Sequence, residues 1–263
     1  MGRSNTGSDS RVWIGGVPVD RFTSGQWCKL MISDWQRKRS QPQLAPKVVT
    51  TVNGQVISLF TESPAFREAI LATDHIAADG MSVVFASRLA TESPLPERVA
   101  TTDWFHAAAK AASRHGMRFY ILGATAEMNA LAIQRIRILY PYLQLAGARD
   151  GYFDREKIGQ LAEEIAVTRP DVLWIGVGNP EQLLLAHAFK DLIPGLTWVR
   201  TCGGLFDFLS GLRSRAPSVM QAAGLEWAYR MALEPRRLGW RYATTNVTAA
   251  MAMARNSRGG TAG

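Results

Sequence analysis

Asp79 is the residue whose type and surroundings most clearly suggest chemistry. It follows the apolar run Ile76–Ala78 and precedes Gly80, and apolar residues resume at Met81. A carboxylate at the end of a buried strand is partly desolvated, which raises its pKa and suits it to act as a general base. Asp-Gly before an apolar run also fits an N-cap of a helix that begins near Met81. The residues alone leave both interpretations open.

Two further groups of small or polar residues come where apolar runs end. They are Thr50, Thr51 and Asn53 at the end of the run 47–53, and Gly176, Gly178, Asn179, Pro180 and Gln182 at and after the end of the run 171–178. In a doubly wound sheet, ligands bind beyond the carboxyl ends of the strands. Both groups are therefore candidates for the same ligand site as Asp79.

Common cofactor and metal motifs are missing from the sequence. The segment "GVGNPE" (176–181) has two glycines of a dinucleotide fingerprint but lacks the third, and no GxxxxGK[ST], HExxH or GxSxG motif occurs. The four histidines have no metal-ligand spacing, and no Asp-x-Asp pair is present. We therefore expect no metal and no cofactor. A phosphorylated leaving group would be held by arginines and by N–H groups at helix N-termini.

Short apolar runs alternate with helix-length segments, which predicts an α/β fold with a doubly wound, mostly parallel, Rossmann-like sheet. The predicted strands cover 11–20, 47–53, 75–79, 117–123, 143–149, 171–178 and 196–202. The predicted helices cover 63–73, 103–116, 125–140 and 154–168, and Thr125 and Asp154 are the expected caps of the last two.

The chain is predicted to divide into a disordered start (1–10), an α/β domain (11–212) and a basic helical appendage (213–263). The appendage has no strand signal and is rich in arginine, tryptophan and tyrosine, which is typical of a helix that lies at a membrane surface. An ordinary pair of core-packing helices with a solvated basic face is the alternative.

The formal net charge of +8 over 263 residues favours phosphate-bearing ligands or an anionic bilayer. Acidic residues are interleaved with basic ones through residues 1–200 and no recognition motif appears, so we expect no nucleic-acid partner. The sequence shows no signal peptide, no run long enough to span a bilayer and no CxxC motif. We therefore expect a cytoplasmic protein that is soluble or lies on a membrane surface without crossing it.

An ordered series of motifs resembles the WecG/TagA/CpsF family, glycosyltransferase family 26, from about Val12 to Tyr242. The motifs are "TVN" (51–53), "ADG" (78–80), "PERV" (96–99), "GARDGYF" (147–153), "PDVLWIGVGNPEQ" (170–182), "GGLFDFLSG" (203–211), "RAP" (215–217), "GLEWAYR" (224–230), and "EPRR" with "RY" (234–242). The resemblance implies an inverting, metal-independent transfer of a sugar from a UDP-sugar to a sugar on a polyprenyl diphosphate lipid. The resemblance also implies a cytoplasmic enzyme that is peripherally associated with the inner face of the plasma membrane, and a homo-oligomer is among the partners considered.

The resemblance also implies roles for particular residues. Asp79 would be the catalytic base, which takes the proton from the acceptor hydroxyl as that oxygen displaces UDP. The acceptor pocket would include Thr51, Asn53 and Asp103. The nucleotide or diphosphate would be contacted by Arg98, Gly178, Gln182, Arg230 and Arg237.

The turn after residue 176 departs from the family pattern. The family usually reads G-x-P-K-Q-E, whereas this chain has Glu181 in place of the lysine and Leu183 in place of the second acid. From this altered turn and the short Ala-rich tail we predict an exopolysaccharide enzyme that transfers glucose or glucuronic acid. The alternatives are an N-acetylmannosaminyl- or N-acetylmannosaminuronosyltransferase, a different Rossmann-like enzyme such as a methyltransferase or dehydrogenase, or a basic binding module without catalysis.

Overall fold

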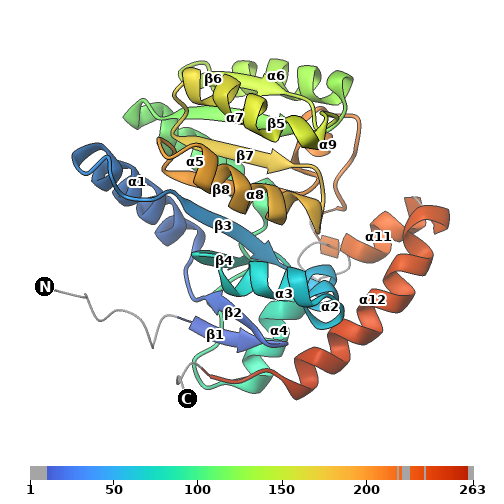
Figure 1. The fold of residues 1–263 in the computed structure, drawn as a ribbon. Helices are drawn as coiled ribbons and strands as arrows, with labels where there is room; N and C mark the ends of the chain where they lie inside the picture. The colour runs from blue at the N-terminus through green and yellow to red at the C-terminus, as the bar shows by residue number, and fades with distance from the viewer. Residues whose placement is uncertain (1–10, 218, 221–225, 234, 260–263) are drawn as a thin grey trace, which may run out of the picture. The chain divides into compact units, whose positions relative to one another are not determined.

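The computed structural model describes residues 11–217, 219–220, 226–233 and 235–259 (Figure 1). Eight strands are present in this part of the chain: β1 (Arg11–Ile14), β2 (Val17–Asp20), β3 (Lys47–Val52), β4 (His75–Ala78), β5 (Arg118–Gly123), β6 (Gln144–Arg149), β7 (Val172–Gly176) and β8 (Trp198–Thr201). The helices are α1 (Ser24–Ser40), α2 (Gly54–Glu62), α3 (Pro64–Leu71), α4 (Met81–Ala90), α5 (Thr101–His115), α6 (Ala126–Leu139), α7 (Ile158–Val167), α8 (Glu181–Leu192), α9 (Leu205–Leu209), α11 (Glu226–Leu233) and α12 (Pro235–Arg255), with a 3₁₀ turn η1 (Arg155–Lys157).

The chain forms two compact units, each made from separate stretches of sequence. Unit 1 comprises Met1–Thr23, Thr51–Ala100 and Arg215–Gly263, and unit 2 comprises Ser24–Thr50 and Thr101–Ser214. The boundary crosses β3, because Thr50 belongs to unit 2 and Thr51 to unit 1. The residues from Arg215 onward thus share a unit with the N-terminal hairpin and with the segment that carries Asp79.

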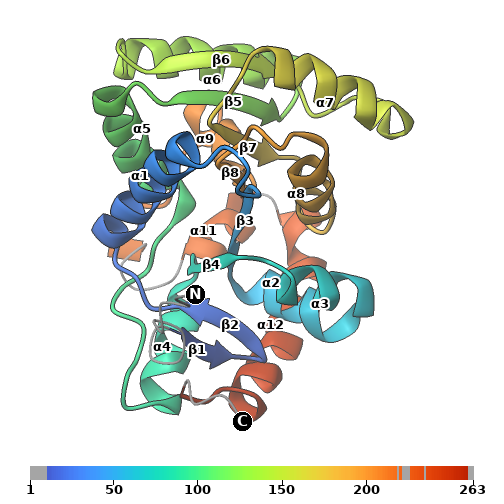
Figure 2. The ribbon, with the colours of Figure 1, turned by 60° about the vertical axis from the view of Figure 1, so that its left-hand side comes forward.

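The main sheet has the strand order β4-β3-β8-β7-β5-β6. The pairs β3–β8, β8–β7, β7–β5 and β5–β6 are all parallel, so the predicted mostly parallel α/β sheet is confirmed. All five residues of β7 are buried, as expected for a strand covered on both faces. In unit 2, α1 and α5 lie on one face of the sheet and α7 and α8 on the other (Figure 2).

Four buried tryptophans pack against one another in the core of unit 2. Trp104 stacks on Trp198 with ring centroids 6.2 Å apart and lies 5.7 Å from Trp174, and Trp27 meets Trp104 edge-on at 6.5 Å. The guanidinium of Arg200, a residue only 1% exposed, lies 5.3 Å from the centroid of the Trp104 ring. A cation over an indole face is favourable, and the low dielectric of the interior strengthens the attraction.

Asp34, on α1, binds residues at the amino ends of two strands of the main sheet, β3 and β8. Its carboxylate accepts hydrogen bonds from the Lys47 ammonium (2.8 Å), the Trp198 indole N–H (2.8 Å) and the Arg37 guanidinium (2.8 Å). Burial alone would raise the pKa of Asp34, but these donors stabilise the charged form and hold the pKa below its ordinary value. Asp34 is thus a structural carboxylate with its acceptor capacity in use.

Unit 1 contains the clearest departure from the predicted strands. Residues 11–20 do not form one strand: β1 and β2 pair antiparallel as a separate two-stranded sheet. The reason is the pair Gly15–Gly16, whose φ angles of 59° and 85° allow a two-residue turn that other residues adopt only with strain. β1 also meets the far end of the chain, because Trp13 exchanges backbone hydrogen bonds with Arg258 (3.0 and 2.8 Å).

Candidate active site

Asp79 lies directly after β4 in unit 1, where the strand has ended at Ala78. Its backbone N–H donates to the carbonyl of Val52, at the end of β3, over 2.9 Å. The N-cap of α4 is Gly80, and no side-chain hydrogen bond caps that helix. The interpretation of Asp79 as an N-cap is therefore wrong. Its position after the carboxyl end of a strand agrees with the alternative, a site for chemistry.

Thr51 and Asn53 stand beside Asp79 through the β3–β4 contact. The side-chain oxygen of Asn53 caps α2 by accepting from the N–H of Val56 (3.1 Å). A Cβ added to Gly80 would lie only 3.4 Å from the Cα of Asn53, so the residues that follow the two strands pack closely together. The cap fixes the orientation of the Asn53 side chain.

Thr50, on the other side of the unit boundary, is engaged differently. Its hydroxyl is buried and lies 2.6 Å from the hydroxyl of Thr201 on the neighbouring strand β8. This pair satisfies both hydroxyl groups inside the sheet. Thr50 is therefore a structural residue, although the sequence places it next to Thr51.

Arg98 reaches the same part of unit 1 from the segment before α5. The N–H of Val99 donates to the carbonyl of Ala78 (2.7 Å), which fixes this segment beside the end of β4. The Arg98 guanidinium pairs with the carboxylate of Glu226 at 3.1 Å, and the side chain of Arg98 is 15% exposed. The guanidinium of Arg215 lies 3.9 Å from the same carboxylate oxygen.

The sequence reasoning missed Glu226 and Arg215 as parts of this group. Glu226 is the first residue of α11. Its ion pair with Arg98 links the "PERV" motif to the "GLEW" motif of the C-terminal appendage. The only signal in the sequence was opposite charge in two motifs far apart, which does not by itself define a pair. Arg230 and Arg237 lie on α11 and α12, and their side chains are outside the described residues.

The remaining predicted residues lie in unit 2. Gly178 has φ +90° in the β7–α8 turn (residues 177–180), which also contains a cis peptide bond before Pro180. Gln182 is buried; its NH₂ donates to Asn179 (3.2 Å) and its oxygen accepts from the N–H of Gly203 (2.9 Å). Gln182 thus ties the β7–α8 turn to the loop after β8. Asp103 is exposed in the first turn of α5.

Glycines allow the backbones after β5 and β7 to meet in unit 2. A Cβ on Gly123 would lie 2.4 Å from the carbonyl oxygen of Gly176, and Gly123 has φ +146°. Ala124 donates to that carbonyl (3.2 Å), and Gly151 donates to the carbonyl of Ala124 (2.8 Å). The carboxyl ends of three adjacent strands are therefore connected mainly through backbone atoms.

The cysteines do not offer a nucleophile. Cys202 is buried at the end of β8, and burial raises the pKa of its thiol far above the ordinary value. Burial also raises the pKa of Cys28. A thiol with a raised pKa has little reactive thiolate near neutral pH.

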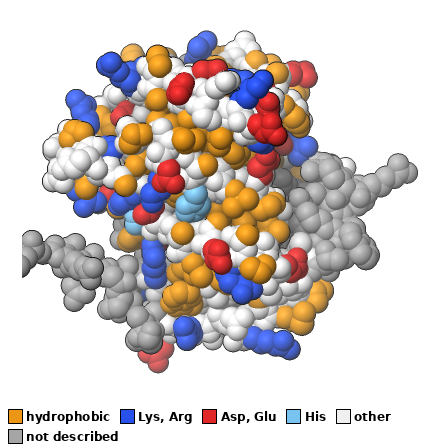
Figure 3. Space-filling view, in the orientation of Figure 1, with side chains coloured by type: hydrophobic (Ala, Val, Ile, Leu, Met, Phe, Trp, Pro, Cys, Tyr) orange, Lys and Arg blue, Asp and Glu red, His pale blue; other side chains and the backbone are white. Residues whose placement is uncertain are grey.

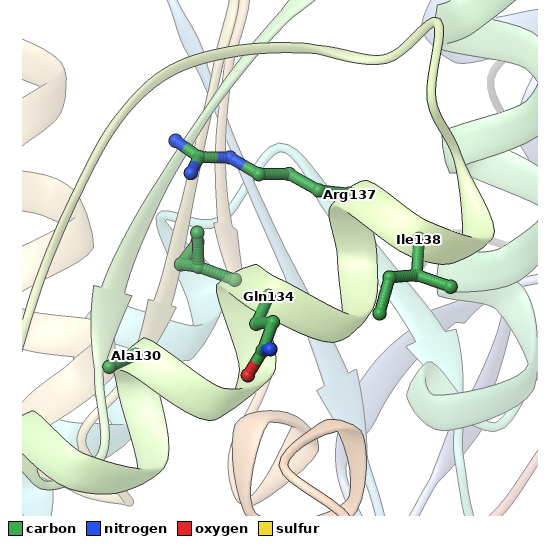
Figure 4. A pocket seen from close by; sticks show the side chains of 5 residues that line it. Ala130, Gln134, Arg137 and Ile138 are labelled. Atoms are coloured by element: carbon green, nitrogen blue, oxygen red, sulfur yellow. The ribbon is translucent and has the colours of Figure 1, made fainter.

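A shallow hollow of about 510 Å³ lies on the outer face of α6 (Figure 4). It is lined by Ala130, Ile133, Gln134, Arg137 and Ile138, all from this one helix. The lining contains no carboxylate to act as a base, so it does not compete with the site at Asp79.

Comparison with known proteins identifies the family to which this chain belongs. Residues 12–262 match the model of the glycosyl transferase WecG/TagA/CpsF family. The chain belongs to this family. It is a glycosyltransferase, and the motifs that the family resemblance rested on include those that carry Asp79, Asn53 and Arg98.

Two relatives are similar to this chain over most of its length. The chain is 32% identical over 193 residues to the N-acetylglucosaminyldiphosphoundecaprenol N-acetyl-beta-D-mannosaminyltransferase of Bacillus spizizenii, covering 73% of each chain. It is 31% identical over 204 residues to the protein of the same name in Bacillus subtilis strain 168, covering 78% of each.

These relatives correct the predicted substrate. The prediction of an exopolysaccharide enzyme that transfers glucose or glucuronic acid is wrong, because the relatives in this part of the WecG/TagA/CpsF family are named as N-acetylmannosaminyltransferases. The prediction relied on Glu181 and Leu183, which replace usual family residues. In the structure, Glu181 forms an ion pair with Arg155 and Leu183 is fully buried. Both residues are therefore engaged in contacts within unit 2.

Proposed function

We propose that this enzyme transfers N-acetylmannosamine from UDP-N-acetylmannosamine to N-acetylglucosaminyl diphosphoundecaprenol. The observation that carries the proposal is the agreement of two relatives, each matched over more than two thirds of its length, on this acceptor and this transferred sugar. Membership of the family supports the reaction class. The UDP part of the donor follows from the family resemblance.

The proposed reaction is a single displacement at the anomeric carbon. Asp79 takes the proton from the attacking hydroxyl of the acceptor sugar, the new glycosidic bond forms, and the bond to UDP breaks with inversion. Thr51, Asn53 and Asp103 line the acceptor pocket. One base suffices, because the diphosphate leaving group is weakly basic and needs charge stabilisation more than a proton.

Charge stabilisation in this proposal comes from the protein itself. Arg98, Arg230 and Arg237 neutralise the diphosphate, while Gly178 and Gln182 contact the nucleotide. Guanidinium groups suit this task, because their planar N–H groups match phosphate oxygens in pairs. We propose that no metal ion takes part.

A donor screen tests this function. With a lipid-linked N-acetylglucosamine acceptor, we expect transfer from UDP-N-acetylmannosamine and little from UDP-glucose or UDP-glucuronate, because a pocket built for one sugar's polar groups rejects another by leaving those groups unpaired. Activity should be unchanged in EDTA. Transfer from UDP-glucose alone would overturn the donor assignment, and activity lost in EDTA and restored by Mg²⁺ would overturn metal independence.

We also propose that the C-terminal appendage (213–263) binds an anionic membrane surface on the cytoplasmic side. No helix in the described part of the chain is long and apolar enough to cross a bilayer. On α12, Val247 and Met251 are one turn apart and remain 58% and 47% exposed, although Ala249 and Ala252 on the same helix are buried. By contrast, acidic and basic side chains are interspersed over the face of unit 2 seen in Figure 3. Exposed apolar residues on a helix rich in arginine favour a lipid surface.

Reversing charge in α12 tests the membrane proposal. The double variant Arg236→Glu and Arg241→Glu should bind anionic vesicles at least about tenfold more weakly, since each arginine contributes about 1 kcal/mol near such a surface. Sedimentation with phosphatidylglycerol vesicles measures the change, and neutral vesicles are the control. Equal sedimentation of the variant and the unmodified enzyme would place the docking surface elsewhere.

A further inference from the structure

Arg155 connects two loops at the carboxyl ends of β6 and β7 in unit 2. Its Nε donates to the carboxylate of Glu181, and its two terminal nitrogens donate to the carbonyls of Phe153 (3.0 Å) and Gly151 (2.9 Å). The guanidinium also lies 3.9 Å from the centroid of the Phe153 ring. Four contacts therefore fix the position of one cation.

Both ends of this connection are anchored. Gly151 is buried, donates to the carbonyl of Ala124 (2.8 Å), and packs so closely that an added Cβ would lie 2.8 Å from the side chain of Val177. On the other side, Glu181 is the first residue of α8 and directly follows the β7–α8 turn. The next residue, Gln182, donates its N–H to the carbonyl of Gly178 (2.8 Å).

We infer that Arg155 is a positioning residue for the donor nucleotide, which acts by holding Glu181 and therefore the β7–α8 turn in one arrangement. This inference rests on the proposed function, in which Gly178 and Gln182 contact the nucleotide. Arginine has five N–H donors in a rigid fork, and the contacts to described residues use three of them.

Removing an ion pair that only stabilises the fold would lower the unfolding temperature, whereas removing one that positions the turn would weaken donor binding. The side chains of Arg155 and Glu181 are 36% and 44% exposed, and ion pairs this accessible contribute little to global stability. Glu181→Gln, which removes the charge pair and leaves the other contacts of Arg155 in place, should therefore leave the unfolding temperature almost unchanged. What it should lose is the alignment of the turn, and small misplacements of binding groups are costly to an enzyme.

Unit 2 supplies a matched control for this pair. Arg149 pairs with Glu164 at 2.7 Å, with side chains 40% and 61% exposed, and also starts from the β6 end of the sheet. Neither partner of the control pair belongs to the β7–α8 turn. Arg149→Ala therefore removes a comparable arginine and a comparable ion pair without touching the link to Glu181.

The test is a double-mutant cycle on donor binding. Arg155→Ala and Glu181→Ala should each raise the KM for the UDP-sugar, and the Kd for UDP measured by calorimetry, on the order of tenfold, with kcat nearly unchanged. The double variant should be no worse than either single variant, because the two residues act through one contact. Arg149→Ala should behave like the unmodified enzyme. If Arg155→Ala folds poorly, Glu181→Gln removes the same charge pair while keeping the side-chain shape.

The outcomes separate this inference from the proposed function. If the unmodified enzyme binds no UDP, the donor assignment fails and the inference fails with it. If it binds UDP but Arg155→Ala and Glu181→Ala match Arg149→Ala, the donor assignment stands and Arg155 does not position the turn. Effects of the two single variants that simply add in the double variant would also overturn the inference, because they would then act independently.

Discussion

Asp79→Asn should fold normally and lose a factor of about 10² to 10⁴ in kcat, which is the range that a general base typically contributes. Asparagine has nearly the same shape and keeps the backbone N–H that bonds to Val52, but its amide cannot accept the proton of the attacking hydroxyl. Single-turnover transfer from UDP-N-acetylmannosamine measures the loss. Unchanged circular dichroism and melting temperature would show that the fold is intact.

A carboxylate at the other end of β4 provides the control. Asp74 directly precedes β4, at the opposite end from Asp79, and Asp74→Asn should retain most of the activity. If Asp79→Asn stays within a few-fold of the unmodified enzyme, the assignment of Asp79 as the base is wrong. The same conclusion would follow if both variants lost activity equally, because the loss would then reflect the strand and not the base.

Arg98→Gln should cost a factor of about 10² to 10³ in kcat/KM for the UDP-sugar, the range seen when one group that stabilises developing charge is removed. Arg98 is held beside the end of β4 by the hydrogen bond from Val99 to Ala78, so its charge is placed before substrate arrives. Glutamine keeps hydrogen-bonding capacity but carries no charge. Initial rates at several donor concentrations measure the effect.

Glu226→Gln distinguishes the two roles that Arg98 could have. If Arg98 serves only to hold α11 through its 3.1 Å ion pair, then Glu226→Gln should be as damaging as Arg98→Gln. If Arg98 contacts the diphosphate, Glu226→Gln should be much milder, since the guanidinium remains. Equal losses in the two variants would therefore remove Arg98 from the list of donor contacts.

The parallel sheet could be predicted because its signals are local. Most of its strands are short apolar runs bounded by Gly, Pro or Asp, and the cap at Thr125 was correctly identified from residue type. Asp154 caps the 3₁₀ turn η1 and not α7, whose N-cap is Lys157. The hairpin at 11–20 was missed although "GG" between two apolar runs is a turn signal, because the apolar residues on both sides were taken as one continuous strand.

The partners of the site residues could not be predicted from local pattern. The pairing of Arg98 with Glu226 depends on how α11 folds back within unit 1, and the bond between Thr50 and Thr201 depends on strand order. Helix α1 was also missed: its apolar residues are interrupted by Asp34 and Lys38, which are buried and paired with partners distant in sequence. Charged residues in a core are explained only by contacts that the sequence does not display.

The contact between β1 and the end of the tail sets an order of assembly during synthesis. The N–H of Gly15 bonds to the hydroxyl of Ser257, 242 residues later, and the backbones of Trp13 and Arg258 pair beside it. Contacts this distant in sequence carry a high loop-closure cost and form late. Every residue of unit 2 is translated before residue 215, so unit 2 can fold on the ribosome while β1 waits for its partner. A nascent chain whose first 214 residues have just left the ribosome would therefore present a folded unit 2 and an incomplete unit 1, and the exposed apolar residues of unit 1 would be a target for chaperones.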